Sequence, residues 1–72
     1  MIKTVDARGL SCPQPVLMTL KKIESMEKGE ILVLVDNDTS KENVARAGAS
    51  KGWKVKQIQT QGNEYHLAFI KE

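Results

Sequence analysis

Residues 31–35, Ile-Leu-Val-Leu-Val, restrict the fold more than any other part of the sequence, because they are apolar at every position. A strand without a polar face must be covered on both sides or lie in the centre of its sheet. The chain has only 72 residues, which suffice for one small domain with a modest core. We therefore expect a single domain over residues 1–72, assembled around this strand.

Two elements are expected before the apolar strand. Residues 2–7 alternate apolar and polar side chains and include β-branched ones, which predicts a short strand. From Pro13 onward the apolar residues recur at helical spacing. A helix is therefore expected to begin with Pro13 as its first residue and to be closed by Gly29.

A second helix is expected after the apolar strand. Residues 39–42, Thr-Ser-Lys-Glu, match a capping box, in which the Thr39 side chain accepts a hydrogen bond from the backbone N–H of Glu42. This helix should run over about residues 40–51 and stop at Gly52.

The chain should end in a β-hairpin. Residues 53–59 and 65–70 are predicted strands, and Gly62-Asn63 fits a two-residue turn of the type that has glycine first. The order is therefore β-α-β-α-β-β. We expect an α/β (α+β) two-layer sandwich, in which two helices cover one face of a four-stranded mixed sheet. The first two strands should be parallel, with a right-handed crossover.

A one-sided helix layer leaves apolar residues on the other face of the sheet. Some of Leu32, Leu34 and Ile70 would then point outward. Such a face indicates either weak coverage or a surface for a partner.

Composition excludes several classes of protein. Eleven Lys and Arg against nine Asp and Glu leave a net charge of +2, too even a balance to indicate nucleic-acid binding. No apolar run approaches the roughly 18 residues that span a bilayer, and the N-terminus does not resemble a signal peptide. We therefore expect a cytoplasmic protein with no membrane contact and no direct contact with nucleic acid.

The chain contains one cysteine and one histidine. A single cysteine excludes an internal disulfide and a CxxC oxidoreductase, and one Cys with one His makes a zinc site very improbable. We expect neither a metal nor a cofactor. His66 lies in the last predicted strand, where a surface or half-buried structural histidine is the simpler interpretation and a general base is the alternative.

Cys12 is the residue most suited to chemistry, because of the prolines beside it. An isolated cysteine is most often an inert, buried side chain. Here Pro13 as the first helical residue would make Cys12 the N-cap, where the positive end of the helix favours a thiolate. Pro13 and Pro15 lack N–H groups, so the Gln14 amide should be the main backbone donor to a local anion. The sequence predicts a stiff junction that holds a reactive thiol outward.

Other polar residues are expected near Cys12. Because Cys12 follows the first strand and residues 36–40 follow the second, parallel pairing would bring both segments to one edge of the sheet. Asp6 and Arg8 flank the loop. They would either support it, with Arg8 also helping the thiolate, or form an exposed ion pair of little energetic value.

The residues around the cysteine form a motif near the N-terminus. Its members are Asp6, Arg8, Gly9, Cys12, Pro13 and Pro15. This D-x-R-G-x-x-C-P-x-P pattern resembles the signature of the TusA family of small sulfur carriers, also called SirA-like proteins, and the similarity in length and element order covers the whole chain. The resemblance implies that Cys12 carries a persulfide.

The same resemblance implies the partners. Sulfur would come from a cysteine desulfurase and pass to the thiol of an acceptor protein, in tRNA thiolation, molybdenum-cofactor synthesis or sulfur oxidation. Residues 35–38 and 40–44 are closest to the YedF branch, associated by name with selenium, whose members often carry a second domain resembling DsrE. The chain is then either a stand-alone carrier or an N-terminal domain, and its cargo is sulfur or selenium.

A different class of function stays open at this point. Small two-layer folds also occur in translation-factor domains, so a non-catalytic RNA-binding or regulatory module is the alternative. A carrier needs only one nucleophilic sulfur, since a second nearby cysteine would attack the persulfide and release sulfide. The single cysteine therefore favours sulfur carriage over redox catalysis. The modest net charge and the single tryptophan weigh against the RNA-binding module.

Overall fold

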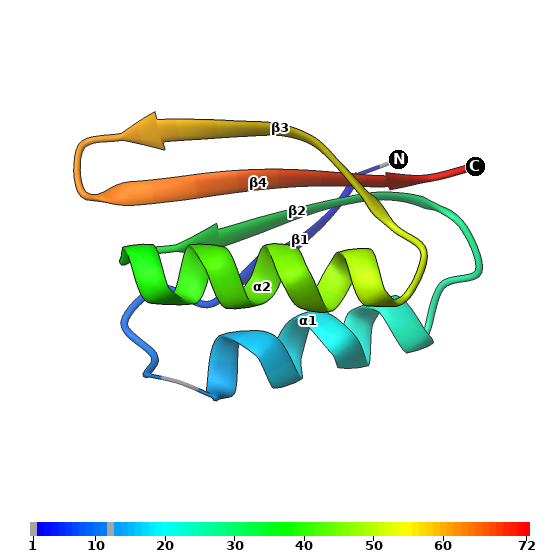
Figure 1. Ribbon diagram of the computed structural model, residues 1–72, viewed down its shortest axis with the longest axis horizontal. Helices are drawn as coiled ribbons and strands as arrows, with labels where there is room; N and C mark the ends of the chain where they lie inside the picture. Colours follow the sequence, from blue (N-terminus) through cyan, green and yellow to red (C-terminus); the bar gives the residue numbers. More distant parts are fainter. Residues whose placement is uncertain (1, 12) are drawn as a thin grey trace.

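The computed structural model describes residues 2–11 and 13–72 and confirms the predicted order of elements (Figure 1). These are β1 (Ile2–Asp6), α1 (Gln14–Glu24), β2 (Gly29–Val35), α2 (Asp38–Ser50), β3 (Lys54–Gln61) and β4 (Glu64–Lys71). The sheet order is β1-β2-β4-β3, with β1 parallel to β2 and the other pairs antiparallel. Both helices lie on one face of the sheet, so the two-layer α+β sandwich is confirmed.

The apolar strand β2 is central, as its composition predicts. It pairs with β1 on one side and with β4 on the other. Ile31, Val33 and Val35 are buried under the helices, whereas Leu32 and Leu34 are half-buried on the opposite face. Within residues 2–11 and 13–72, no helix is long and apolar enough to cross a membrane.

The core lies between the sheet and the two helices. Its buried apolar residues are Val5, Ala7, Ile23, Ile31, Val33, Val35, Val44, Trp53, Leu67 and Phe69. α2 approaches β4 closely at Gly48, because a Cβ atom at this position would overlap the ring of Phe69. The contact explains why a residue of low helix propensity lies inside α2.

Helix α1 differs from its prediction at both ends. Its first helical residue is Gln14, so Pro13 is the N-cap and not the first helical residue. The helix ends at Glu24, with Ser25 as its C-cap. Gly29 does not close it and instead begins β2 with a φ of 128°. A glycine is needed there because other residues rarely adopt this backbone conformation.

Helix α2 begins two residues earlier than predicted, and the Thr39 capping box is wrong. Asn37 is the N-cap, and its side-chain oxygen accepts from the backbone N–H of Ser40 at 2.7 Å. Asn37 has an extended backbone and a short side-chain acceptor, the two properties that an N-cap requires. Thr39 already belongs to the helix.

The end of α2 and the hairpin turn agree with the sequence. The N–H of Gly52 bonds to Ala49 and that of Trp53 to Gly48, both at 3.1 Å. With Gly52 at a φ of 84°, this is the Schellman pattern of a helix C-terminus. Gly62 also has a positive φ, of 62°, and Asn63 does not, which confirms a turn with glycine first.

Gly48→Ala tests the close packing of α2 on β4. At an exposed helix position, alanine stabilises the helix by about 1 kcal/mol relative to glycine. At position 48, however, the added methyl group would overlap Phe69. We expect the free energy of unfolding in urea to fall by about 1–3 kcal/mol, the usual effect of overpacking.

Two controls accompany this measurement. Ala49→Gly, at an exposed position of the same helix, should lower stability by about 1 kcal/mol through propensity alone. Phe69→Leu in the Gly48→Ala background should remove part of the overlap, so the two changes should be less than additive. Stability unchanged or raised by Gly48→Ala would show that the ring moves aside freely.

Candidate functional site

The candidate site lies where β1 and β2 end. The N–H of Ala7 donates to the carbonyl of Leu34 at 2.9 Å, which continues the pairing one residue past β1. Because the two strands are parallel, the chain that leaves β1 emerges beside the residues that link β2 to α2. The loop after β1 and the start of α2 meet at this edge, where Gly9 contacts Asp36 (Figure 1). The expectation that Cys12 lies beside residues 36–40 falls outside the described residues.

Asp36 ties the loop after β1 to the start of α2. One carboxylate oxygen accepts from the backbone N–H of Gly9 at 2.7 Å, and the other lies 3.3 Å from the side-chain nitrogen of Asn37. Asn37 in turn caps α2. Asp36 was expected at this edge, but its contact with Gly9 was not. The available signal was a carboxylate directly after a strand parallel to the one that precedes the loop.

Arg8 is held between two carboxylates. Its Nε and Nη2 donate to the two oxygens of Asp6 at 2.9 and 2.8 Å, and its Nη1 lies 3.2 and 3.3 Å from the oxygens of Glu64. Asp6 also accepts from the backbone N–H of Arg8 at 3.2 Å. The structure therefore brings Asp6 and Arg8 together and adds Glu64, which lies 56 residues from Arg8 in sequence and was not expected at the site.

The opposite charges of Arg8 and of its two partners, Asp6 and Glu64, stabilise one another. Hydrogen bonds from Arg8 lower the pKa of Asp6 to about 2. The pKa of Glu64 is lowered, mainly by its hydrogen bond with His66 and to a smaller extent by Arg8. Hydrogen bonds to Asp6 and Glu64 raise the pKa of Arg8. His66 Nε2 lies 3.2 Å from Glu64 Oε1, and the imidazole is half-buried. The partner of the His66 imidazole is therefore the Glu64 carboxylate, which also contacts Arg8.

The start of α1 is fixed by local hydrogen bonds. The N–H of Gln14 donates to the carbonyl of Ser11 at 2.9 Å, and the carbonyl of Pro15 accepts from the Thr19 hydroxyl at 2.9 Å. Pro15 and Thr19 are buried, so the first turn of α1 is anchored in the core. Ser11, Pro13 and Gln14 are exposed.

Two predictions for the first turn of α1 are wrong. The Gln14 amide was expected to be the main donor to a local anion, but the carbonyl of Ser11 already accepts its hydrogen. Pro13 takes the N-cap position that was expected for Cys12. The cause is the backbone of Pro13, which at φ −99° and ψ 15° lies outside the helical range. Cys12 itself lies outside the described residues.

A groove of about 460 Å³ adjoins Pro13. It runs between the two helices and is lined by Pro13, Val16, Asn43, Arg46, Ala47 and Ser50. Its lining places apolar surface and one arginine beside the start of α1.

The ion pairs of Arg8 predict how stability depends on pH. Asp6 and Glu64 have lowered pKa values, so their contribution is present above the ordinary values of 3.8 and 4.5 and is lost as pH falls through the values of the folded protein. We expect Arg8→Gln to lower the thermal unfolding midpoint at neutral pH. This difference from the wild type should shrink as the pH falls toward about 2.

Arg46→Gln is the matched control for Arg8→Gln. It removes the same charge from an exposed arginine that forms no ion pair within residues 2–11 and 13–72. The difference in thermal unfolding midpoint between Arg46→Gln and the wild type should not change over the pH range in which Asp6 and Glu64 become protonated. A constant difference for Arg8→Gln down to pH 2 would contradict the assignment.

Asp36→Ala tests the contact between Asp36 and the loop. Loss of a charge-assisted hydrogen bond should speed exchange of the Gly9 amide hydrogen by roughly tenfold. Asp36→Asn keeps an acceptor oxygen and should have a smaller effect. Asp38→Ala removes a nearby carboxylate whose partners are Lys41 and Tyr65, and it should leave exchange at Gly9 unchanged. Equal rates in all three variants would disprove the tether.

Comparison with known proteins agrees with the fold and with the family that the sequence resembles. A family model described as sulfurtransferase TusA matches residues 3–71. The crystal structure of a SirA-like protein from Desulfitobacterium hafniense is 29% identical in sequence and matches with a TM-score of 0.85, over 97% of this chain and 96% of that one. The resemblance inferred from the sequence is thereby confirmed at the level of the family. The chain belongs to the TusA family of sulfur-transfer proteins.

Proposed function

We propose that Cys12 is the sulfur-carrying residue, which accepts sulfur from the persulfide of a cysteine desulfurase and passes it to the thiol of an acceptor protein. The observation that carries this proposal is the exposure of Ser11 and Pro13, the residues on either side of Cys12, at the start of α1. A carrier must present its sulfur to large partners, so it needs an accessible position. Membership of a sulfur-transfer family supports the same role.

The transfer needs no group beyond two thiols. The Cys12 thiolate attacks the outer sulfur of the donor persulfide, a bond forms between the Cys12 sulfur and that atom, and the S–S bond of the donor breaks. The donor leaves as a thiolate, and Cys12 becomes a persulfide. The acceptor thiolate then attacks the outer sulfur in the same way, which returns Cys12 to a thiolate. Each step exchanges one S–S bond for another, so no external oxidant or reductant is consumed.

The residues near Cys12 support this role by position. Asp36 holds Gly9, and the pairing with Asp6 and Glu64 holds Arg8. Because two carboxylates already neutralise Arg8, we assign it to support of the loop and not to stabilisation of a thiolate. Pro13 and Pro15 supply the rigid start of α1, and the bond from Gln14 to Ser11 completes it.

Mass spectrometry after incubation with a cysteine desulfurase, its pyridoxal phosphate and free cysteine tests the proposal. The intact protein should gain about 32 Da, the mass of one sulfur atom, and reduction should reverse the gain. Cys12→Ser should show no gain, because the chain has no other cysteine. Ser11→Ala changes a neighbouring hydroxyl and leaves the thiol in place, so it should still be loaded.

Two outcomes would contradict the proposal. One is an unmodified thiol in folded protein under conditions that load an established carrier. The other is an unmodified thiol together with tight, salt-sensitive binding of RNA, which would favour the alternative of an RNA-binding module.

A further inference from the structure

Strand β1 has a free backbone edge. It pairs with β2 on one side, and among the described residues no strand pairs with its other side. The N–H of Ala7 points to β2, where it bonds to Leu34. Since backbone groups alternate along a parallel strand, those of Lys3 and Val5 also point to β2. The backbone groups of Ile2, Thr4 and Asp6 therefore point away from the sheet.

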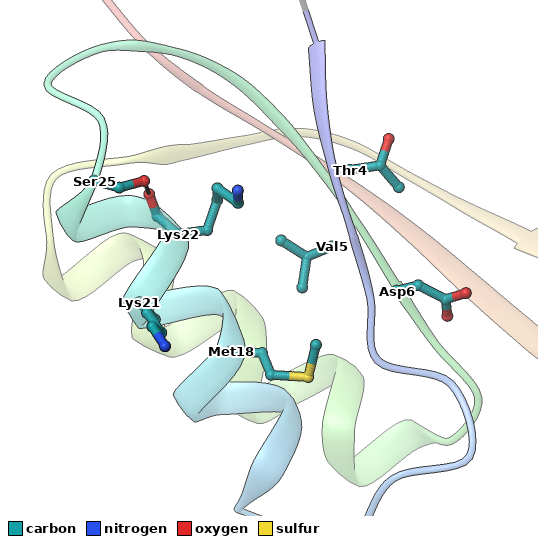
Figure 2. A pocket seen from close by; sticks show the side chains of 7 residues that line it. All are labelled: Thr4, Val5, Asp6, Met18, Lys21, Lys22 and Ser25. Atoms are coloured by element: carbon teal, nitrogen blue, oxygen red, sulfur yellow. Dashed lines mark hydrogen bonds between the residues drawn. The ribbon is translucent and has the colours of Figure 1, made fainter.

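A cavity of about 430 Å³ lies beside this edge. Figure 2 shows Val5 and Met18 pointing into the space between β1 and α1, whereas Thr4 and Asp6 project from β1 away from the helix. The cavity therefore has an apolar floor where side chains from an added strand would point. Unpaired backbone groups and an apolar groove along one strand are the two features used in recognition by strand addition.

Two lysines give the groove a positive rim. Lys21 and Lys22 both line it, and Lys22 extends from α1 toward β1 (Figure 2). Neither forms an ion pair within residues 2–11 and 13–72. The carboxylate in the lining, Asp6, is already paired with Arg8. The unbalanced charge at the groove is therefore positive.

We propose that an extended, acidic segment of a partner protein binds here as an additional strand on β1. Its backbone bonds to the outward groups of Ile2, Thr4 and Asp6. Its side chains that face α1 are of two kinds, apolar ones that enter the groove and carboxylates that contact Lys21 and Lys22 at the rim. The binding does not depend on the chemistry proposed for Cys12.

The other free edge of the sheet, at β3, and a second copy of the chain as the occupant of β1 both fit less well. The free edge at β3 contains a bulge between Val55 and Gln57, and bulges hinder edge pairing. A second copy of the chain would place its own Lys21 and Lys22 beside the same lysines, and like charges oppose that contact. The pairing of β1 with β2 has no such register shift, and a negatively charged segment bound to β1 meets no repulsion from these lysines.

Titration of the isotope-labelled chain with a designed peptide, followed by NMR, tests this inference. The probe is a capped peptide of about six residues, the usual strand length, in which valine and glutamate share one face and threonine occupies the other. Amide shifts should be concentrated in β1 and in the part of α1 that carries Lys21 and Lys22. Binding should weaken with added salt. The same peptide with lysine in place of glutamate should bind at least fivefold more weakly.

Variants separate the backbone and charge contributions. Thr4→Pro removes an outward N–H without removing a bond to β2, and it should weaken binding by roughly tenfold. Ile2→Pro does the same at the first strand residue and serves if Thr4→Pro does not fold. Lys22→Glu should weaken binding roughly fivefold. Lys56→Glu, the matched charge change on β3, should have no effect.

Several results would overturn the inference. They are shifts concentrated on β3, equal binding of the acidic and basic peptides, full binding by folded Thr4→Pro and Ile2→Pro, and the absence of shifts at millimolar peptide. Shifts of β1 that depend on protein concentration without peptide would indicate a second copy as the occupant and would also overturn it.

Discussion

The parallel pairing of β1 with β2 is the interaction on which the candidate site depends. It brings the carboxyl ends of both strands to one edge, so that the loop before α1 lies next to the segment before α2. Asp36 can then accept from Gly9, although the two are 27 residues apart in sequence. An antiparallel arrangement of the same strands would place these segments at opposite edges. The pairing is secured by burial of Val33 and Val5, which are partners in the register and lie in the core.

The charged group around Arg8 extends this arrangement to a third strand. Asp6 is the last residue of β1, and Glu64 begins β4, which lies on the far side of β2. Arg8 spans the end of β2 and joins the two. Exposed ion pairs generally add little to stability. Their value here is geometric, because the backbone N–H of Arg8 is bound as well as its side chain, which fixes the direction in which the loop leaves β1.

The elements that could be predicted from sequence are those that their own residues specify. Residues 31–35 indicate a strand in the centre of its sheet, and Gly52 and Gly62 mark a helix end and a turn through a conformation that favours glycine. Predictions failed where neighbouring residues compete for one role, as Asn37 and Thr39 do for the N-cap of α2.

Contacts that depend on strand order could not be predicted. The hydrophobic pattern identifies four strands but does not state that β4 lies next to β2, and the bond between Arg8 and Glu64 follows only from that order. The use of the Gln14 amide by Ser11 was missed for a different reason. Pro13 and Pro15 each lack an N–H group, which leaves that of Gln14. This fact alone does not show that the carbonyl of Ser11 accepts it. The motif thus indicates where a candidate site would lie, whereas the hydrogen bonds within this region are seen only in the structure.

A sulfur carrier must release each partner after contact, which limits how strongly any docking surface can bind. β1 has five residues, and only alternate ones direct backbone groups outward. Each hydrogen bond contributes about 1 kcal/mol net, so strand addition here gives a weak complex that dissociates rapidly. Because β1 leads directly into the loop before Cys12, a segment bound along it would bring the rest of its protein close to that loop. A short free edge therefore meets both requirements of a relay, which are local guidance of a partner and its prompt release.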